Sequence, residues 1–209
     1  MHWKKTTRTM TPKPAPCPSD SGAPTVSRIF LIGYRGTGKS TVGRHLAALL
    51  GWQFVDADGH LEVEQGRSIR EIFATQGEPV FRDLESAVLL ELAQREHCVI
   101  ATGGGIILRP ENRAVLKHTG FVAWLDGEPA MIWNRLQADP TTADRRPNLT
   151  ATGGLAEVVS IMHARQPLYA ETASVMFPTE GHSPETVAVA ILNAWQAASR
   201  DLPPAHAPG

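Results

Sequence analysis

The chain has 209 residues, of which 42% are hydrophobic and 20% are charged, which suits one α/β domain with terminal tails and a sizeable core. Its formal net charge of -1 and its pI near 6.7 argue against a large nucleic-acid-binding face, which normally shows as a basic excess. No apolar run approaches the length of a membrane span, and the eight histidines lack the spacing of metal ligands.

The two ends of the chain differ in composition from the rest. Residues 1–27 are rich in Pro, Thr and basic side chains, hold no acidic residue before Asp20, and lack the apolar segment of a secretory signal. We expect a disordered leader here, with a transit peptide as the alternative, and a second disordered tail at residues 201–209. Cys17 and Cys98 form no disulfide framework, so we expect a reducing, cytoplasmic compartment.

A phosphate-binding loop follows the first predicted strand, Arg28 to Gly33. The stretch "LIGYRGTGKSTVG" fits G-x-x-x-x-G-K-[ST], and residues 40–50 carry apolar side chains at helical intervals. Such a loop points backbone N–H groups and a helix N-terminus at phosphate oxygens. Lys39 supplies a charge for the β- and γ-phosphates and Ser40 a hydroxyl for Mg²⁺, whereas Thr41 either touches the α-phosphate or caps the helix. The predicted nucleotide-binding residues of the loop are Gly36, Thr37, Gly38, Lys39, Ser40 and Thr41.

Two carboxylates end the second predicted strand, Gln53 to Asp56. In extended chain, Asp56 and Asp58 would point to the same side. One could hold Mg²⁺ through its waters, and the other could orient a substrate hydroxyl for attack. The alternative is an Asx turn in which Asp58 caps a helix from Gly59.

Helices are predicted within residues 68–95, and "GEPVFRDLE" places Arg82 and Glu85 three apart on one helical face. The glutamate can hold the guanidinium so that its planar fork meets a substrate carboxylate. A surface helix contact is the alternative.

The third predicted strand, Cys98 to Thr102, ends in Gly103, Gly104 and Gly105. Without side chains, these residues would let backbone N–H groups approach a ligand closely, although a triple glycine also suits a sharp bend.

The second half continues the alternation of helix and strand. Helices are predicted at residues 110–118, 128–137, 155–166 and 184–200, with strands at 121–126 and 174–177. This alternation predicts a mostly parallel sheet covered on both faces, with ligands at the carboxyl ends of the strands.

A polar stretch at about 137–154 is too long for an ordinary connector, and we expect a mobile lid. Within it, Arg145 and Arg146 could meet charge on a transferring phosphoryl group, unless the stretch is a plain surface loop. Arg165, in "ARQPLYAE", is expected near the end of the next helix. Its positive charge there could simply complement the negative C-terminal end of that helix.

Taken in order, these motifs closely resemble those of shikimate kinases, which belong to the nucleoside-monophosphate-kinase-like P-loop group. The resemblance runs from about Ile29 to Asn193. It rests on GxxxxGKST, D-x-D, "SIREIF", "GEPVFRDLE", the GGG strand end, R-P in the polar stretch and R-x-P-L-Y. It implies a three-layer αβα domain over residues 28–200, a five-stranded parallel sheet in the order 2-3-1-4-5, and ATP and Mg²⁺ as cofactors. Because no second domain accompanies this one, we expect a monomer.

The resemblance also implies a role for each site residue. Lys39, Asp58 and Arg146 would be catalytic, with Lys39 and Arg146 on the γ-phosphate and Asp58 on the ring hydroxyls of shikimate. Arg82 and Arg165 would clamp the shikimate carboxylate beside the backbone of Gly103 to Gly105. Ser40 would bind Mg²⁺ with Asp56 in its outer shell, and Arg135 would lie near the adenine. The implied reaction is attack of the shikimate 3-hydroxyl on ATP.

The chain departs from the family pattern at a few positions. Tyr34 and Arg35 stand where many members have smaller residues. Arg35 could therefore add a contact to the lid. Ala57 stands where Thr or Ser is usual, and Asn148 stands where Leu is frequent. The lid is a few residues longer than in compact members of the family. Two other functions stay in view: another small-metabolite P-loop kinase, such as a gluconate kinase, and a regulatory protein that binds nucleotide without turnover.

Overall fold

The computed structural model describes residues 27–138 and 154–200. The predicted leader up to residue 26, the predicted tail and residues 139–153 lie outside the described residues, and with them Arg145, Arg146 and Asn148.

Five parallel strands form one sheet in the order β2-β3-β1-β4-β5, which confirms the expected topology. Register within the sheet is continuous, since Phe30 of the central strand pairs with Ile100 on one side and Val122 on the other. The strands are β1 (Arg28–Ile32), β2 (Gln53–Asp56), β3 (Cys98–Ala101), β4 (Phe121–Asp126) and β5 (Val175–Pro178).

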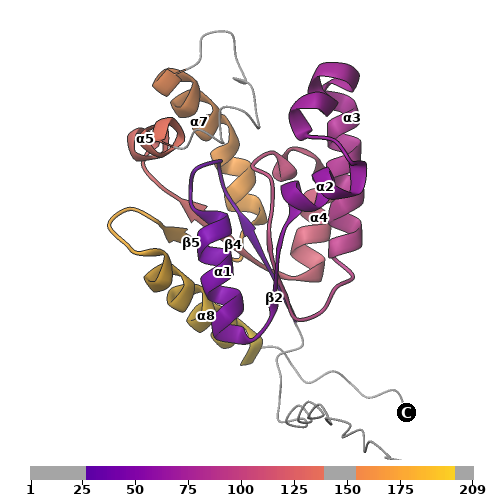
Figure 1. The fold of residues 1–209 in the computed structure, drawn as a ribbon. Helices are drawn as coiled ribbons and strands as arrows, with labels where there is room; N and C mark the ends of the chain where they lie inside the picture. Colours follow the sequence, from indigo (N-terminus) through magenta and orange to yellow (C-terminus); the bar gives the residue numbers. More distant parts are fainter. Residues whose placement is uncertain (1–26, 139–153, 201–209) are drawn as a thin grey trace, which may run out of the picture.

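Helices cover both faces of the sheet, so the described chain has three layers (Figure 1). α1 and α8 pack together on one face, and α3, α4 and α7 lie over the other. The helices are α1 (Lys39–Leu50), α2 (Ala57–Gln65), α3 (Ile69–Leu92), α4 (Pro110–Thr119), α5 (Pro129–Ala138), α7 (Gly154–Thr172) and α8 (Pro184–Arg200), with a short 3₁₀ turn η1 (Ile106–Leu108).

Side chains of β1 alternate between the two layers because successive residues of a strand face opposite sides. Ile29 and Leu31 pack among α1 and α8, whereas Phe30 and Ile32 pack beneath α3 and α4. All four are fully buried, which fixes the register of the central strand.

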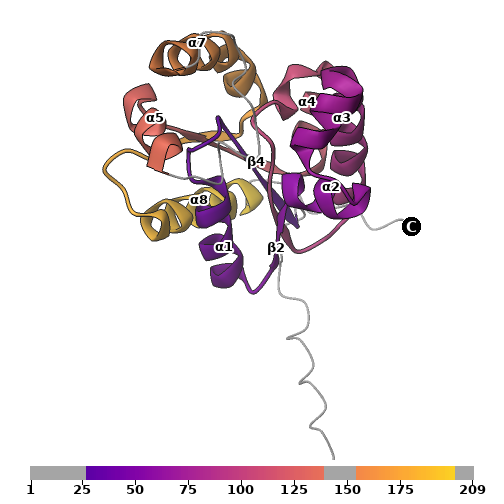
Figure 2. The same ribbon diagram turned by 45° about the horizontal axis from the view of Figure 1, so that its top comes forward.

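The carboxyl ends of the strands meet at one edge of the sheet, where the phosphate loop, Asp56 and the Gly103 turn follow β1, β2 and β3. In Figure 2, which brings this edge forward, α5 and α7 stand on one side of it and α2 and α3 on the other. This edge therefore holds the motifs that the sequence singled out.

α3 lies within the predicted range 68–95, whereas α7 differs from its predicted range. α3 begins with a complete capping box between Ser68 and Glu71, and it contains a kink at Gly77, whose φ is 82°. α7 does not end near Gln166 as predicted, but continues through Pro167 to Thr172, since Tyr169 beyond the proline is buried against the sheet. Among the described residues, no helix is both long and apolar enough to span a membrane.

Candidate active site

The phosphate loop turns tightly between β1 and α1. Gly33 adopts a φ of +138°, and a Cβ there would collide with the carbonyl oxygen of Leu125, so this position admits only glycine. Lys39 folds back over the loop, and its Nζ donates to the carbonyl oxygens of Gly33 and Tyr34 at 2.8 Å each. The ammonium charge thus lies within the loop that would surround the phosphates.

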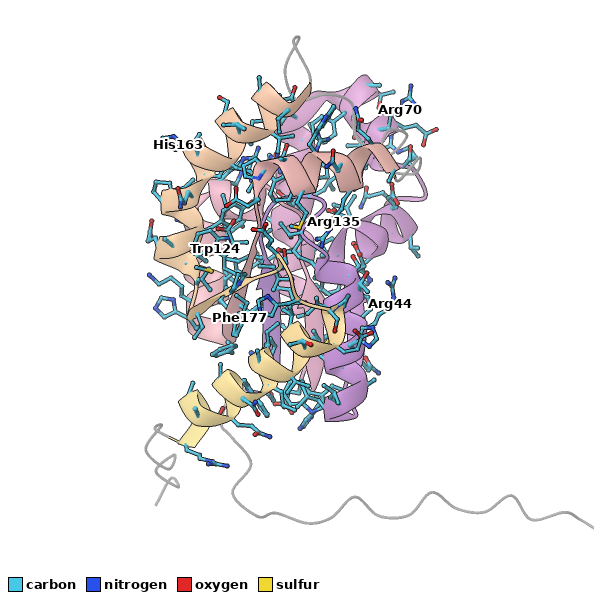
Figure 3. All side chains as sticks on the ribbon, turned by 90° about the vertical axis from the view of Figure 1, so that its left-hand side faces the viewer. Arg44, Arg70, Trp124, Arg135, His163 and Phe177 are labelled. Atoms are coloured by element: carbon cyan, nitrogen blue, oxygen red, sulfur yellow. The ribbon has the colours of Figure 1, made fainter. Side chains whose placement is uncertain are left out.

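A cavity of about 270 Å³ opens beside this loop and the start of α1. Arg135 of α5 lines it, and its Nη1 donates to the carbonyl oxygen of Gly36 at 3.4 Å. Figure 3 shows Arg135 between α5 and α8, and Pro184 at the start of α8 also lines the cavity. The other lining residues include Gly36, Thr37, Gly38 and Thr41, so the cavity adjoins the phosphate loop.

Two threonines of the loop differ in what they offer a nucleotide. The Thr37 hydroxyl donates to the carbonyl oxygen of Tyr34 at 2.8 Å and stabilises the turn itself. Thr41 is exposed and lines the cavity, and the cap position of α1 is occupied by Gly38, which has no side chain to cap the helix.

Ser40 and Asp56 meet across the loop, where the Ser40 hydroxyl donates to Asp56 Oδ2 at 2.6 Å. A hydroxyl and a carboxylate beside a phosphate loop are the oxygen donors that Mg²⁺ prefers, so these two residues fit the predicted ion. Asp56, not Asp58, is the cap of α2: its Oδ1 accepts from the backbone N–H of Gly59 at 3.3 Å.

Asp58 lies in the first turn of α2, because the strand ends at Asp56. The expectation that both carboxylates project from extended chain is therefore wrong. Asp58 instead lines a small cavity together with Glu85 and Gly103, which brings it to the side of the site where α3 and the glycine turn lie.

Arg82 is held from both sides on α3. Its Nη1 donates to Glu85 at 2.7 Å, as the three-residue spacing predicted, and its Nη2 donates to Glu78 at 2.9 Å. Burial would lower the pKa of Arg82, but the ion pair and hydrogen bond with Glu85 and those with Glu78 together raise it above its ordinary value. The side chain is 10% exposed, so it is a fixed, permanently charged group and not a surface contact.

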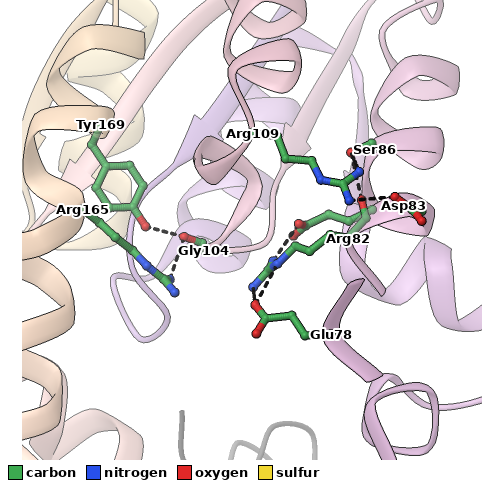
Figure 4. Close-up of polar contacts among 9 residues, drawn as sticks. Glu78, Arg82, Asp83, Ser86, Gly104, Arg109, Arg165 and Tyr169 are labelled. Carbon is green, nitrogen blue, oxygen red and sulfur yellow. Dashed lines mark hydrogen bonds and ion pairs between the residues drawn. The ribbon is translucent and has the colours of Figure 1, made fainter. Parts of the chain in front are cut away.

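The glycine turn after β3 places a second arginine opposite Arg82. Arg165 Nη1 and the Tyr169 hydroxyl both donate to the carbonyl oxygen of Gly104, at 3.2 and 2.6 Å. Figure 4 shows Arg165 and Arg82 reaching from α7 and α3 toward one another past this turn. Since α7 ends seven residues later, at Thr172, complementarity to the helix C-terminus does not explain Arg165.

Sequence reasoning gave no role to three residues that shape this site. Glu78 and Tyr169 each lie four residues from a predicted arginine, Arg82 and Arg165, on the same helical face, and that spacing was a usable signal. Glu157, in contrast, pairs with Arg35 across 122 positions of sequence, and no local pattern indicates it.

Comparison with known proteins identifies the family to which the chain belongs. Residues 35–196 match the family described as shikimate kinase. The chain belongs to the shikimate kinase family. A shikimate kinase of Rhodopirellula baltica is 44% identical over 166 residues, covering 79% of this chain and 89% of that protein. One of Symbiobacterium thermophilum is 42% identical over 168 residues, covering 80% and 95%.

Solved structures place shikimate kinases and a more distant kinase on the same fold. The shikimate kinase of Acinetobacter baumannii, solved in complex with shikimate, superposes with a TM-score of 0.77 at 37% identity, covering 86% of this chain and 97% of that one. A gluconokinase of Sinorhizobium meliloti is 16% identical with a TM-score of 0.50, covering 84% and 95%. That likeness shows a common fold and nothing about substrate.

Proposed function

We propose that this chain transfers the γ-phosphoryl group of ATP to the 3-hydroxyl of shikimate, a step of aromatic amino acid biosynthesis. The observation that carries the proposal is the pair of arginines, Arg82 and Arg165, that flank the Gly104 turn beside an intact phosphate loop. Membership of the shikimate kinase family points to the same reaction.

The two arginines would bind the shikimate carboxylate. Arg82 is already neutralised in part by Glu78 and Glu85, which hold its guanidinium in place and leave it fixed for a bidentate contact. Arg165 would bind from the α7 side, with Gly103, Gly104 and Gly105 supplying backbone along the ring. A carboxylate held at two points fixes the orientation of the ring and hence of its hydroxyls.

Asp58 would orient the attacking hydroxyl. It lines one small cavity together with Gly103. From there its carboxylate would accept the hydroxyl hydrogen and hold the oxygen in line with the γ-phosphorus. Asp58 is therefore the residue that we propose as catalytic on the acceptor side.

The nucleotide would occupy the loop and the cavity beside Arg135, with the adenine between Arg135 and α8. Lys39 would exchange its two loop carbonyls for β- and γ-phosphate oxygens. Ser40 would hold Mg²⁺, with Asp56 bound through water; the ion, when bound, neutralises phosphate charge and orients the β- and γ-oxygens.

Four further assignments rest on sequence. We propose Arg146 as a third positive charge on the transferring phosphoryl group, from its place in the R-P motif. We also propose that residues 137–154 act as a lid. We propose further that the protein acts as a monomer in the cytoplasm, with shikimate as its small-molecule partner.

The test is ADP release from ATP and Mg²⁺ with shikimate, with gluconate and with neither. We expect release with shikimate alone, and mass spectrometry should find one added phosphate on it. Equal release with gluconate would favour a broader sugar-acid kinase. Nucleotide binding without turnover on any acceptor would favour a regulatory protein.

A further inference from the structure

An ion pair between a half-buried arginine and a buried glutamate joins the phosphate loop to the beginning of α7. Arg35 Nη2 lies 3.5 Å from Glu157 Oε1, and the two side chains are 15% and 2% exposed. Glu157 lies in the first turn of α7, where the positive end of the helix dipole also favours a carboxylate. A charge removed from water to this extent is retained only where it is paired.

The preceding residue strengthens the same connection. Tyr34 is 2% exposed and packs in a small apolar cluster with Ile132 and Leu136 of α5 and Val158 of α7. Two consecutive loop residues therefore fasten the phosphate loop to these helices, one through apolar packing and one through charge.

The other half of α7 is fastened to the glycine turn. Arg165 and Tyr169 bind the Gly104 carbonyl oxygen, and the Gly104 backbone in turn lies against the loop. A Cβ at Gly104 would approach the backbone nitrogen of Arg35 to 3.3 Å. Contacts thus run in a closed ring from the loop through Glu157 and α7 to Gly104 and back to the loop.

We infer that Arg35 and Glu157 are positioning residues, which act through Arg165. Their pairing fixes α7 against the phosphate loop and so sets the distance between the carboxylate held by Arg165 and the phosphate held by Lys39. This inference rests on the proposed function, because it takes Arg165 as a shikimate contact. Neither Arg35 nor Glu157 is required to touch a reacting atom.

The test compares two glutamates of the same helix. Glu157→Gln breaks the pair with the loop. Glu171→Gln breaks a pair of similar length, 3.4 Å, between Arg113 of α4 and a more exposed glutamate near the far end of α7. We expect Glu157→Gln to lower kcat/KM for shikimate by about ten- to a hundredfold, since a displacement of order 1 Å costs about that much, while the Kd for ADP changes less than about twofold. Glu171→Gln should retain the wild-type values.

The route through Arg165 is tested by combining variants. In an Arg165→Ala background, Glu157→Gln should cost much less than it does alone, because the residue that it positions is gone. Arg35→Gln tests the pair from the loop side and Arg35→Lys, which keeps the charge, should recover part of the loss. Full additivity of the Glu157 and Arg165 losses would overturn the inference.

Thermal unfolding separates positioning from stability. If Glu157→Gln and Arg35→Gln lower Tm but keep wild-type shikimate kinetics well below Tm, the pair is only structural and the inference is wrong. If the wild-type protein does not phosphorylate shikimate at all, the proposed function fails first, and that result is visible before any variant is made.

Discussion

Replacing Gly105 by alanine should weaken shikimate binding without touching the nucleotide. A Cβ at position 105 would collide with Nη1 of Arg82 and lie 2.7 Å from its Cζ and Nη2. Ordinary contact begins at 3.4 Å, so Cζ and Nη2 would have to retreat by about 0.7 Å, and Nη1, which lies nearer, by more than that. A long side chain usually gives way easily, but this one is held by Glu78 and Glu85 and is 10% exposed.

The cost follows from what the displaced group does. If Arg82 moves, its charge-assisted bond to the shikimate carboxylate is lost or lengthened, and such a bond is worth about 1.5 to 3 kcal/mol. That range corresponds to a rise of about tenfold to more than a hundredfold in KM for shikimate. KM for ATP should change less than about twofold, since the alanine is directed at Arg82 and not at the phosphate loop.

The assay is steady-state ADP release, with shikimate varied at saturating ATP and then the reverse. Gly59→Ala is the control, because a Cβ there would meet only Asp56 Cβ at 3.9 Å, an ordinary contact, and alanine favours the helix. An unchanged KM for shikimate in Gly105→Ala would refute the placement of Arg82 as a carboxylate ligand. Equal rises in both KM values would show a general distortion of the site instead.

Other substitutions test the remaining assignments separately. Lys39→Ala should lower kcat by at least about a thousandfold while the protein stays folded by circular dichroism, because the phosphoryl group loses its fixed positive charge. Ser40→Ala should raise the Mg²⁺ concentration needed for half-maximal rate, measured by titration at fixed ATP. Arg165→Ala should raise KM for shikimate about tenfold or more, and KM for ATP little. Arg146→Ala should lower kcat with little change in ADP affinity by calorimetry, whereas Arg145→Ala should stay active. The reverse result would show that Arg145, and not Arg146, contacts the transferring phosphoryl group.

The phosphate loop and the sheet could be predicted because their signals are local. Gly33, Lys39 and Ser40 stand within eight residues, and the strand before them and the helix after them show their own periodicity. The same holds for the Arg82–Glu85 pair, which needed only helical spacing. Where the residues that set the geometry lie within one helix, strand or loop, their spacing in the sequence is enough to predict it.

Contacts between distant elements could not be predicted in this way. The hydrogen bonds of Arg165 and Tyr169 to Gly104 span more than sixty residues, and whether a helix lies over that turn depends on the packing of α7. The same packing carries α7 beyond Pro167, where the residue pattern indicated an end. Asp56, and not Asp58, caps α2 for a smaller reason: the strand ends at Asp56, two residues before the second carboxylate.

The structural roles of Gly103, Gly104 and Gly105 depend on contacts with distant elements. From sequence, they suited either a close approach of backbone to ligand or a plain bend, and the structure shows two more specific uses. Gly104 offers its carbonyl oxygen to Arg165 and Tyr169, and Gly105 leaves open the volume that Arg82 fills. One turn therefore locates both arginines, from opposite helices, relative to the loop that would bind phosphate. A side chain at Gly105 would displace Arg82, the charge on which the proposed recognition of the acid depends, whereas a side chain at Gly104 would press on the backbone of the phosphate loop at Gly33 and Arg35. The smallest residues of the site are therefore as informative as its charged ones.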